Sequence, residues 1–121
     1  MNLDKLIELT LKNGGASVSF NTGVFNPKVG FFSSFKGHQL IIELEDFTPS
    51  KVRALMLPYL IKNKDLIRVN NNFIGTWVNN ELVYVDISKQ FIYESLCYRF
   101  AVNNSQRAYY NAESQEVVNL N

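Results

Sequence analysis

Turn-forming residues divide the sequence into short apolar segments, and this division limits the folds open to the chain. Residues 16–20, 29–35 and 39–44 are rich in β-branched or aromatic side chains, and Asn, Gly and Pro stand between them. Asn and Gly adopt the left-handed backbone angles that tight turns require. Short segments between such turns are typical of antiparallel strands. No apolar run approaches the roughly 18 residues of a membrane span, so we expect no membrane partner.

Two further segments have the spacing of amphipathic helices. Apolar residues recur at helical spacing over residues 3–11, and Gly14 and Gly15 supply a stop. Thr48 and Pro49 form a helix start, because a hydroxyl residue caps well and proline suits the first helical position. Pro58 lies inside this second helix and predicts a kink or an early end. The apolar stripe of the second helix comprises Val52, Leu55, Met56, Tyr59 and Leu60.

The second half of the chain predicts a hairpin, a third helix and a last hairpin. Residues 73–78 and 82–87 read as strands joined by a tight turn at residues 79–81. Ser88 is expected to cap a helix through about Ala101, with Ile92, Leu96 and Phe100 on its inner edge. Residues 106–111 and 116–120 form the closing hairpin. The predicted order is α-βββ-α-ββ-α-ββ, an α+β fold with an antiparallel sheet and about three helices in a single domain over residues 1–121.

Composition narrows the classes of function. Apolar residues make up 46% of the 121 residues and charged residues 19%, which is typical of a soluble globular domain. The N-terminus lacks a basic flank followed by an apolar core, and Cys97 is the single cysteine, so we expect a cytoplasmic protein. The formal net charge of +1 makes nucleic acid a disfavoured partner.

The motifs of common enzymes are absent from the sequence. It has no phosphate-binding GxxxxGK[ST] loop, no GxGxxG, no HExxH and no GxSxG. His38, the one histidine, follows Gly37 and is expected at the surface. Cys97 is expected to be a buried structural thiol, and the acidic residues at 43, 45 and 46 a solvated edge rather than a metal site. We therefore expect a binding protein without enzymatic activity, cofactor or metal.

Aromatic residues outnumber what a small core needs, and some of them alternate with basic and amide residues. The sequence has 9 Phe, 6 Tyr and 1 Trp. One cluster surrounds residues 28–38, and another follows the third helix. Aromatic rings stack on bases, guanidinium groups bind phosphates, and amides bind ring edges, a combination that suits a nucleotide-like ligand. The alternative is that these aromatics are core residues and the arginines solvated. The predicted ligand-binding residues are Arg99, Asn104, Gln106, Arg107 and Tyr109.

Strand alternation gives these predictions a geometry. If Ala108 packs inward, Arg107 and Tyr109 share the outer face of their strand, with a guanidinium beside an aromatic ring. Arg99, one short loop earlier, is expected to supply a second guanidinium. In the preceding hairpin, Trp77 and Tyr84 have a phase that places both inward, which would make Trp77 a core residue.

Several short motifs resemble small phage and prophage proteins. They are Gly14-Gly15-Ala16, Asn26-Pro27, Val29-Gly30-Phe31, Gly75-x-Trp77, Val83-Tyr84-Val85-Asp86-Ile87-Ser88 and Asn103-Asn104-x-Gln106-x-Ala108-Tyr109. The chain is similar to the Thoeris anti-defence family. This resemblance implies a phage-encoded protein that sequesters a cyclic ADP-ribose-type immune signal without cleaving it. It also implies a homo-oligomer that holds the ligand near subunit interfaces in the host cytoplasm.

Two other function classes fit the same sequence. One is a mobile-element protein that inhibits a host defence complex by protein–protein contact. The other is an accessory protein that binds single-stranded nucleic acid, which the aromatics favour and the balanced charge disfavours. Bound nucleotide after purification, a salt-sensitive shift with oligonucleotides, or a co-purifying host protein would distinguish the three.

Overall fold

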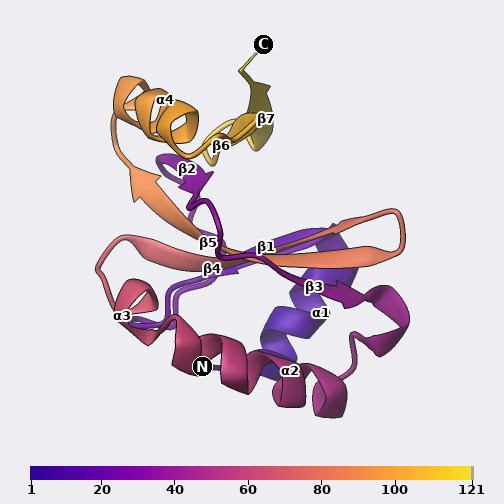
Figure 1. The fold of residues 1–121 in the computed structure, drawn as a ribbon. Coiled ribbons are helices and arrows are strands. Elements are labelled where there is room, and N and C mark those ends of the chain that lie inside the picture. Colours follow the sequence, from indigo (N-terminus) through magenta and orange to yellow (C-terminus); the bar gives the residue numbers. More distant parts are fainter. Residues whose placement is uncertain (121) are drawn as a thin grey trace.

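An antiparallel sheet runs through the centre of the protein in the computed structural model, which describes residues 1–120 (Figure 1). The helices are α1 (Leu3–Asn13), α2 (Pro49–Lys62), α3 (Lys64–Ile67) and α4 (Glu94–Asn103), with a 3-10 turn η1 (Leu44–Asp46). The strands are β1 (Gly15–Val18), β2 (Phe31–Ser34), β3 (Leu40–Glu43), β4 (Asn72–Asn79), β5 (Leu82–Phe91), β6 (Ala108–Asn111) and β7 (Glu116–Asn119). The α+β class and the predicted order are confirmed, with α3 and η1 as additions.

The strands follow the spatial order β1-β4-β5-β2-β6-β7, and β3 also pairs with β5. Helices α1, α2 and α3 lie below the sheet in Figure 1, and α4 lies above it beside β6 and β7. We call α4, β6 and β7, which rest on β2, the α4 unit. No helix of the described residues is both long and apolar enough to cross a membrane.

The turn between β4 and β5 is the one that the sequence predicts. Asn80 and Glu81 have φ angles of 51° and 64°, so both central residues of the two-residue loop are left-handed. Two-residue hairpins favour this geometry because it matches the twist of the flanking strands. The turn pairs β4 with β5 along their length, with Asn79 opposite Leu82 and Asn72 opposite Lys89.

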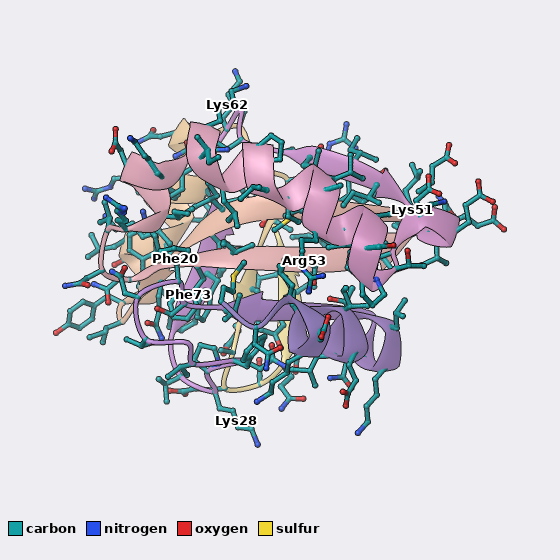
Figure 2. All side chains as sticks on the ribbon, turned by 90° about the horizontal axis from the view of Figure 1, so that it is seen from below. Phe20, Lys28, Lys51, Arg53, Lys62 and Phe73 are labelled. Carbon is teal, nitrogen blue, oxygen red and sulfur yellow. The ribbon has the colours of Figure 1, made fainter. Side chains whose placement is uncertain are left out.

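Aliphatic side chains from the lower helices and the sheet form the main core. Helix α1 contributes Leu6, α2 contributes Val52 and Met56, and alternate residues of β5 contribute Val83 and Val85. Each of these side chains is at most 1% exposed. From below, α1 and α2 cross this face of the sheet, and Lys51 and Lys62 of α2 point to solvent (Figure 2). The amphipathic stripes therefore fold both helices onto one side of the sheet.

The early end that the sequence predicted for helix α2 at Pro58 is not found. The helix continues through Pro58 to Lys62. Proline removes one amide donor from the helix, which costs most where water cannot replace the missing bond. Pro58 and Ala54 are both exposed, so water can reach the carbonyl that the proline leaves without a donor. The buried side chains on the opposite side of α2, such as Met56 and Tyr59, hold the helix on the sheet.

The predicted start of the third helix is also wrong. Ser88 is a buried strand residue that pairs with Phe73 of β4 and Ser34 of β2, and β5 continues to Phe91. Two strands on either side supply partners for its backbone, and this pairing outweighs the local capping preference of a serine. Helix α4 begins at Glu94, which leaves Ile92 83% exposed instead of on an inner edge.

Trp77 is not a core residue. Its ring stacks on that of Tyr84 with centroids 4.5 Å apart and planes 17° apart, and the tryptophan is 43% exposed. Val83 and Val85 flank Tyr84 in β5 and take the inner face, so alternation places Tyr84 on the opposite face. Trp77, directly across from Tyr84, lies on that face with it. The phase predicted for this pair was therefore wrong.

Candidate functional site

The structure separates the predicted ligand-binding residues into different surfaces around α4. Arg99 and Tyr109 line a groove along the helix, which we call the α4 groove. Asn104 and Gln106 line a smaller cleft beyond the end of the helix, which we call the β5 cleft. Arg107 is exposed, lies just before β6 rather than in a strand, and lines neither hollow.

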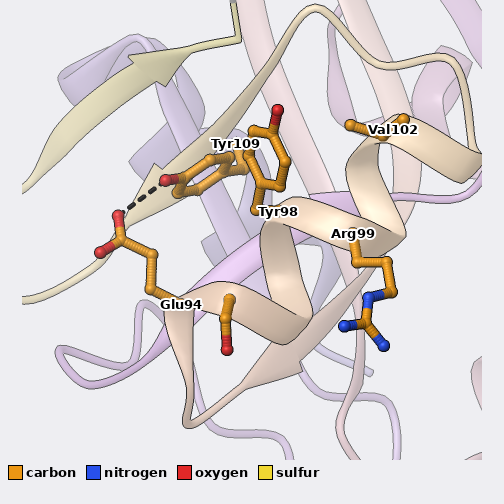
Figure 3. A pocket seen from close by; sticks show the side chains of 6 residues that line it. Glu94, Tyr98, Arg99, Val102 and Tyr109 are labelled. Carbon is orange, nitrogen blue, oxygen red and sulfur yellow. Dashed lines mark hydrogen bonds between the residues drawn. The ribbon is translucent and has the colours of Figure 1, made fainter.

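The α4 groove has a volume of about 640 Å³ and is lined by Glu94, Ser95, Tyr98, Arg99, Val102 and Tyr109. Tyr98 is 50% exposed and offers part of its ring to solvent. Figure 3 shows Tyr98 and Tyr109 together on one side of α4, while the guanidinium of Arg99 points away from them. Among the described residues Arg99 has no hydrogen-bond or ion-pair partner, so its side chain is free to turn.

Tyr109 is part of a small core, which corrects its predicted position beside Arg107. Its ring is 7% exposed and packs with Cys97 and Ala101 of α4. The small side chains at these positions leave space that the tyrosine ring fills. Its hydroxyl donates a hydrogen bond of 2.7 Å to Oε2 of Glu94 (Figure 3). This bond is the main cause that raises the pKa of Tyr109 to about 12. Tyr109 thus fixes Glu94 at the groove, and its face is closed to a base.

The β5 cleft arises where two strands diverge from β5. Strand β3 pairs with β5 up to Val85, and β2 pairs with it from Ser88 onward. The register leaves Asp86 between the two pairings, at the floor of a cleft of about 190 Å³. Its lining residues are Ser34, Phe35, Lys36, Gly37, Gln39, Asp86, Asn104, Ser105 and Gln106.

Asp86 is the residue that sequence reasoning did not select. Its Oδ2 accepts a hydrogen bond of 2.8 Å from Oγ of Ser34. Burial raises the pKa of this carboxyl to about 6, and the bond from Ser34 opposes that shift. Neither ion pair of the described residues involves Asp86. An aspartate between Val85 and Ile87 of a strand was the available signal, because strands are poor in Asp.

Asn104 and Gln106 have structural bonds within the cleft. The side chain of Asn104 accepts from the backbone amide of Lys36 at 3.1 Å and donates to the carbonyl of Phe100 at 3.0 Å. Nε2 of Gln106 donates to the carbonyl of Asn104 at 3.0 Å. Asn104 therefore ends α4 and fixes the loop after β2. Gln106 keeps its carbonyl oxygen without a partner among the described residues.

The other groups considered from the sequence lie away from these hollows. Cys97 is fully buried, and burial raises its pKa to about 12, so it is a neutral thiol. His38 is half-buried rather than at the surface, and its Nδ1 lies 2.7 Å from Oδ1 of Asn63. Carboxylate oxygens of Glu43, Glu45 and Asp46 lie within 4.8 Å of one another, and Lys51 pairs with Asp46 at 2.8 Å.

Comparison of this chain with protein-family models, with curated proteins and with solved structures finds no match.

Proposed function

We propose that the protein binds a nucleotide-like small molecule in the α4 groove and holds it without cleaving it. The observation that carries the proposal is the exposed ring of Tyr98 in a groove that also contains Arg99 and Glu94. The groove volume of about 640 Å³ falls within the range of small-molecule sites. Stacking, phosphate binding and hydroxyl binding are the contacts that a nucleotide needs.

Each of these side chains has a distinct role in the proposed complex. Tyr98, rather than the buried Tyr109, stacks on the base. Arg99 turns toward the groove and binds a phosphate by charge-assisted hydrogen bonds. Glu94 has one oxygen engaged by Tyr109, and the other accepts from a ribose hydroxyl or a base amino group. Arg107 remains a secondary phosphate contact in this proposal, because it is exposed and lies between the end of α4 and the start of β6.

The biological role that fits this chemistry is sequestration of a signal. The resemblance to the Thoeris anti-defence family supports a cyclic ADP-ribose-type ligand and action in the cytoplasm of an infected host. Sequestration needs affinity and no reactive group, so the neutral, buried thiol of Cys97 is compatible with it. A ligand recovered intact after release would support sequestration, and a cleaved product would contradict it.

The proposal includes self-association. Ile92, Tyr93 and Leu96 are 83%, 68% and 47% exposed at the start of α4, next to the groove. Burial of such side chains against a second copy would remove apolar surface from water and enclose the ligand. Light scattering tests this directly, and the mass of one 13.9 kDa chain at high micromolar concentration would contradict it.

Calorimetric titration with cyclic ADP-ribose isomers tests the binding proposal. Tyr98→Ala and Arg99→Ala should each weaken binding by about tenfold or more, since stacking and charged hydrogen bonds each contribute about 1–3 kcal/mol. Arg53→Ala is the matched control, because Arg53 is an exposed arginine on α2, remote in sequence from the groove. Equal affinity in all variants would contradict the proposed site. A salt-sensitive shift with oligonucleotides, without nucleotide binding, would instead favour a nucleic-acid-binding protein.

The second candidate function is inhibition of a host protein by direct contact. The same exposed residues favour it, because Ile92 and Tyr93 form an apolar surface that no described residue covers. Exposed apolar patches of this kind mark interaction sites. Tyr98→Ala would separate the candidates, since it should weaken nucleotide binding and leave capture of a host protein through Ile92 and Tyr93 unchanged.

A further inference from the structure

The β5 cleft contains a carboxylate that the fold leaves without a cationic partner. Asp86 accepts one hydrogen bond, from Ser34, through Oδ2, and its Oδ1 has no partner among the described residues. Oδ1 is not fully buried. The fully buried side-chain atoms that lack a hydrogen bond among the described residues are Ser33 Oγ and Asn72 Oδ1. Oδ1 therefore keeps some contact with solvent, and Asp86 is part of the cleft lining. A partly buried carboxylate that serves only the fold is normally paired or bonded several times.

Gly75 keeps this carboxylate in its position. It lies directly opposite Asp86 in the pairing of β4 with β5. A Cβ atom at residue 75 would come within 2.8 Å of Oδ1 of Asp86. Any larger residue would therefore push the carboxylate away from its present place. A glycine inside a strand weakens the strand, so its presence here marks a place where another group approaches closely.

Gln106 supplies a second free acceptor in the cleft. The carbonyl oxygen of Gln106 has no partner among the described residues, because the bond from its amide nitrogen goes to Asn104. Phe35 supplies an aromatic wall, and its ring is already in edge contact with Phe100. Lys36 is the cationic member of the lining and is exposed, while its backbone amide, not its side chain, is bound to Asn104.

From this arrangement we infer that the β5 cleft is a second binding site, for a small organic cation with N–H donors of the guanidinium type. A guanidinium presents its donors in a plane, which suits the carboxylate of Asp86 and the carbonyl of Gln106. The volume of about 190 Å³ admits a small cation and excludes a complete nucleotide. The site is independent of the α4 groove, since the two hollows share no lining residue.

The electrostatics of Asp86 agree with a cationic ligand. Burial raises the pKa of the carboxyl, so the ionised form is disfavoured in the free protein. A bound cation would offset this cost through a charge-assisted hydrogen bond. Lys36 lines the same cleft, and the field of Asp86 adds to the burial that raises the pKa of Tyr59, whose hydroxyl donates to the carbonyl of His38.

Titration with butylguanidine and its neutral analogue butylurea, followed by two-dimensional amide NMR, tests the inference. Butylguanidine should shift the amides of Ser34, Gly37 and Ser105, and butylurea should not. Asp86→Asn should weaken binding roughly 10- to 100-fold, as expected for loss of a charged hydrogen bond. Gly75→Ala, which keeps the carboxylate and displaces it, should weaken binding as well.

Asp65→Asn is the matched control, because Asp65 is an exposed aspartate on α3 outside the cleft. Equal shifts with butylurea, or unchanged binding in Asp86→Asn, would overturn the inference. Shifts confined to the α4 groove would overturn it too. A failure here leaves the nucleotide titration of the groove unaffected, so the two proposals fail separately.

Discussion

The main core and the α4 unit are built from different kinds of residues. Most of the largest fully buried side chains, among them Leu6, Met56 and Ile74, belong to the main core. Of that group only Cys97 lies in the α4 unit. The core of the α4 unit instead combines a thiol, an alanine and the ring of Tyr109. Free energy of folding is therefore concentrated below the sheet.

The difference also separates stability from chemistry. Polar and aromatic groups gather around α4: the exposed Tyr98 and Arg99 along the helix, and the partly buried Asp86 in the cleft beyond its end. Regions with few buried apolar contacts open more easily, and binding segments are commonly found there. The comparison teaches that the lower helices and the sheet hold most of the buried apolar side chains, while the proposed ligand contacts lie around α4.

The largest predicted effect is a cavity in the main core. Ile74→Ala should lower the free energy of unfolding by about 3–4 kcal/mol, because Ile74 is fully buried and a cavity adds to the lost burial. Cys97→Ala, which removes one atom from the α4 unit, should cost about 1 kcal/mol. Urea denaturation of both variants measures the two losses in free energy of unfolding. Equal losses would break the comparison.

Asp86→Asn should stabilise the protein, and the gain should depend on pH. The folded pKa of about 6 exceeds the unfolded value, so the native state binds the extra proton between about pH 4 and pH 6. Stability therefore falls as the pH rises through this window, and the full cost is present above it. At pH 8 the variant should gain up to roughly 3 kcal/mol, and at pH 3 almost nothing. Thermal melts across this range that show no such dependence would indicate a solvated carboxyl.

Tyr109→Phe should destabilise the α4 unit by about 1–2 kcal/mol, because it removes a hydrogen bond to a carboxylate. Tyr110→Phe is the control, since Tyr110 is the exposed neighbour in β6. A double-mutant cycle with Glu94→Ala isolates the energy of the bond, because alanine has no side-chain acceptor. Zero coupling in that cycle would show that Glu94 and Tyr109 act independently.

The smallest effect concerns Trp77. Loss of its exposed stack on Tyr84 should cost about 1 kcal/mol, instead of the roughly 3–5 kcal/mol expected for a buried tryptophan. Urea denaturation of Trp77→Ala, monitored by circular dichroism, measures this loss in the free energy of unfolding. A cost above about 3 kcal/mol would mean that another surface covers this face of the sheet in solution.

The sequence predicts the fold where local signals agree with tertiary packing. The turn at residues 79–81 and the amphipathic helices are such cases, because their residues have one favourable conformation. Ser88 shows where this fails: a serine is a good helix cap, but pairing with β2 and β4 decides its structure. The prediction that Trp77 is a core residue fails for a related reason. Strand alternation determines which residues share a face of the sheet, but it does not determine which face is covered.

The candidate site was predicted in part. The sequence selects the region around α4, because its basic, amide and aromatic residues are close together along the chain. It does not separate Tyr109, which packs inward, from Tyr98, which is exposed. The contact between Asp86 and Ser34 could not be predicted from local sequence patterns, because the two residues are 52 positions apart in the chain.

Hydrogen exchange with and without a cyclic ADP-ribose-type nucleotide tests most directly whether the α4 unit is the binding region. The account predicts slower exchange of the α4 amides and of β6 when the ligand is present. Exchange in α1 and α2, below the sheet, should stay within error of the free protein. Protection confined to α2, or no change in α4 at saturating ligand, would contradict the account.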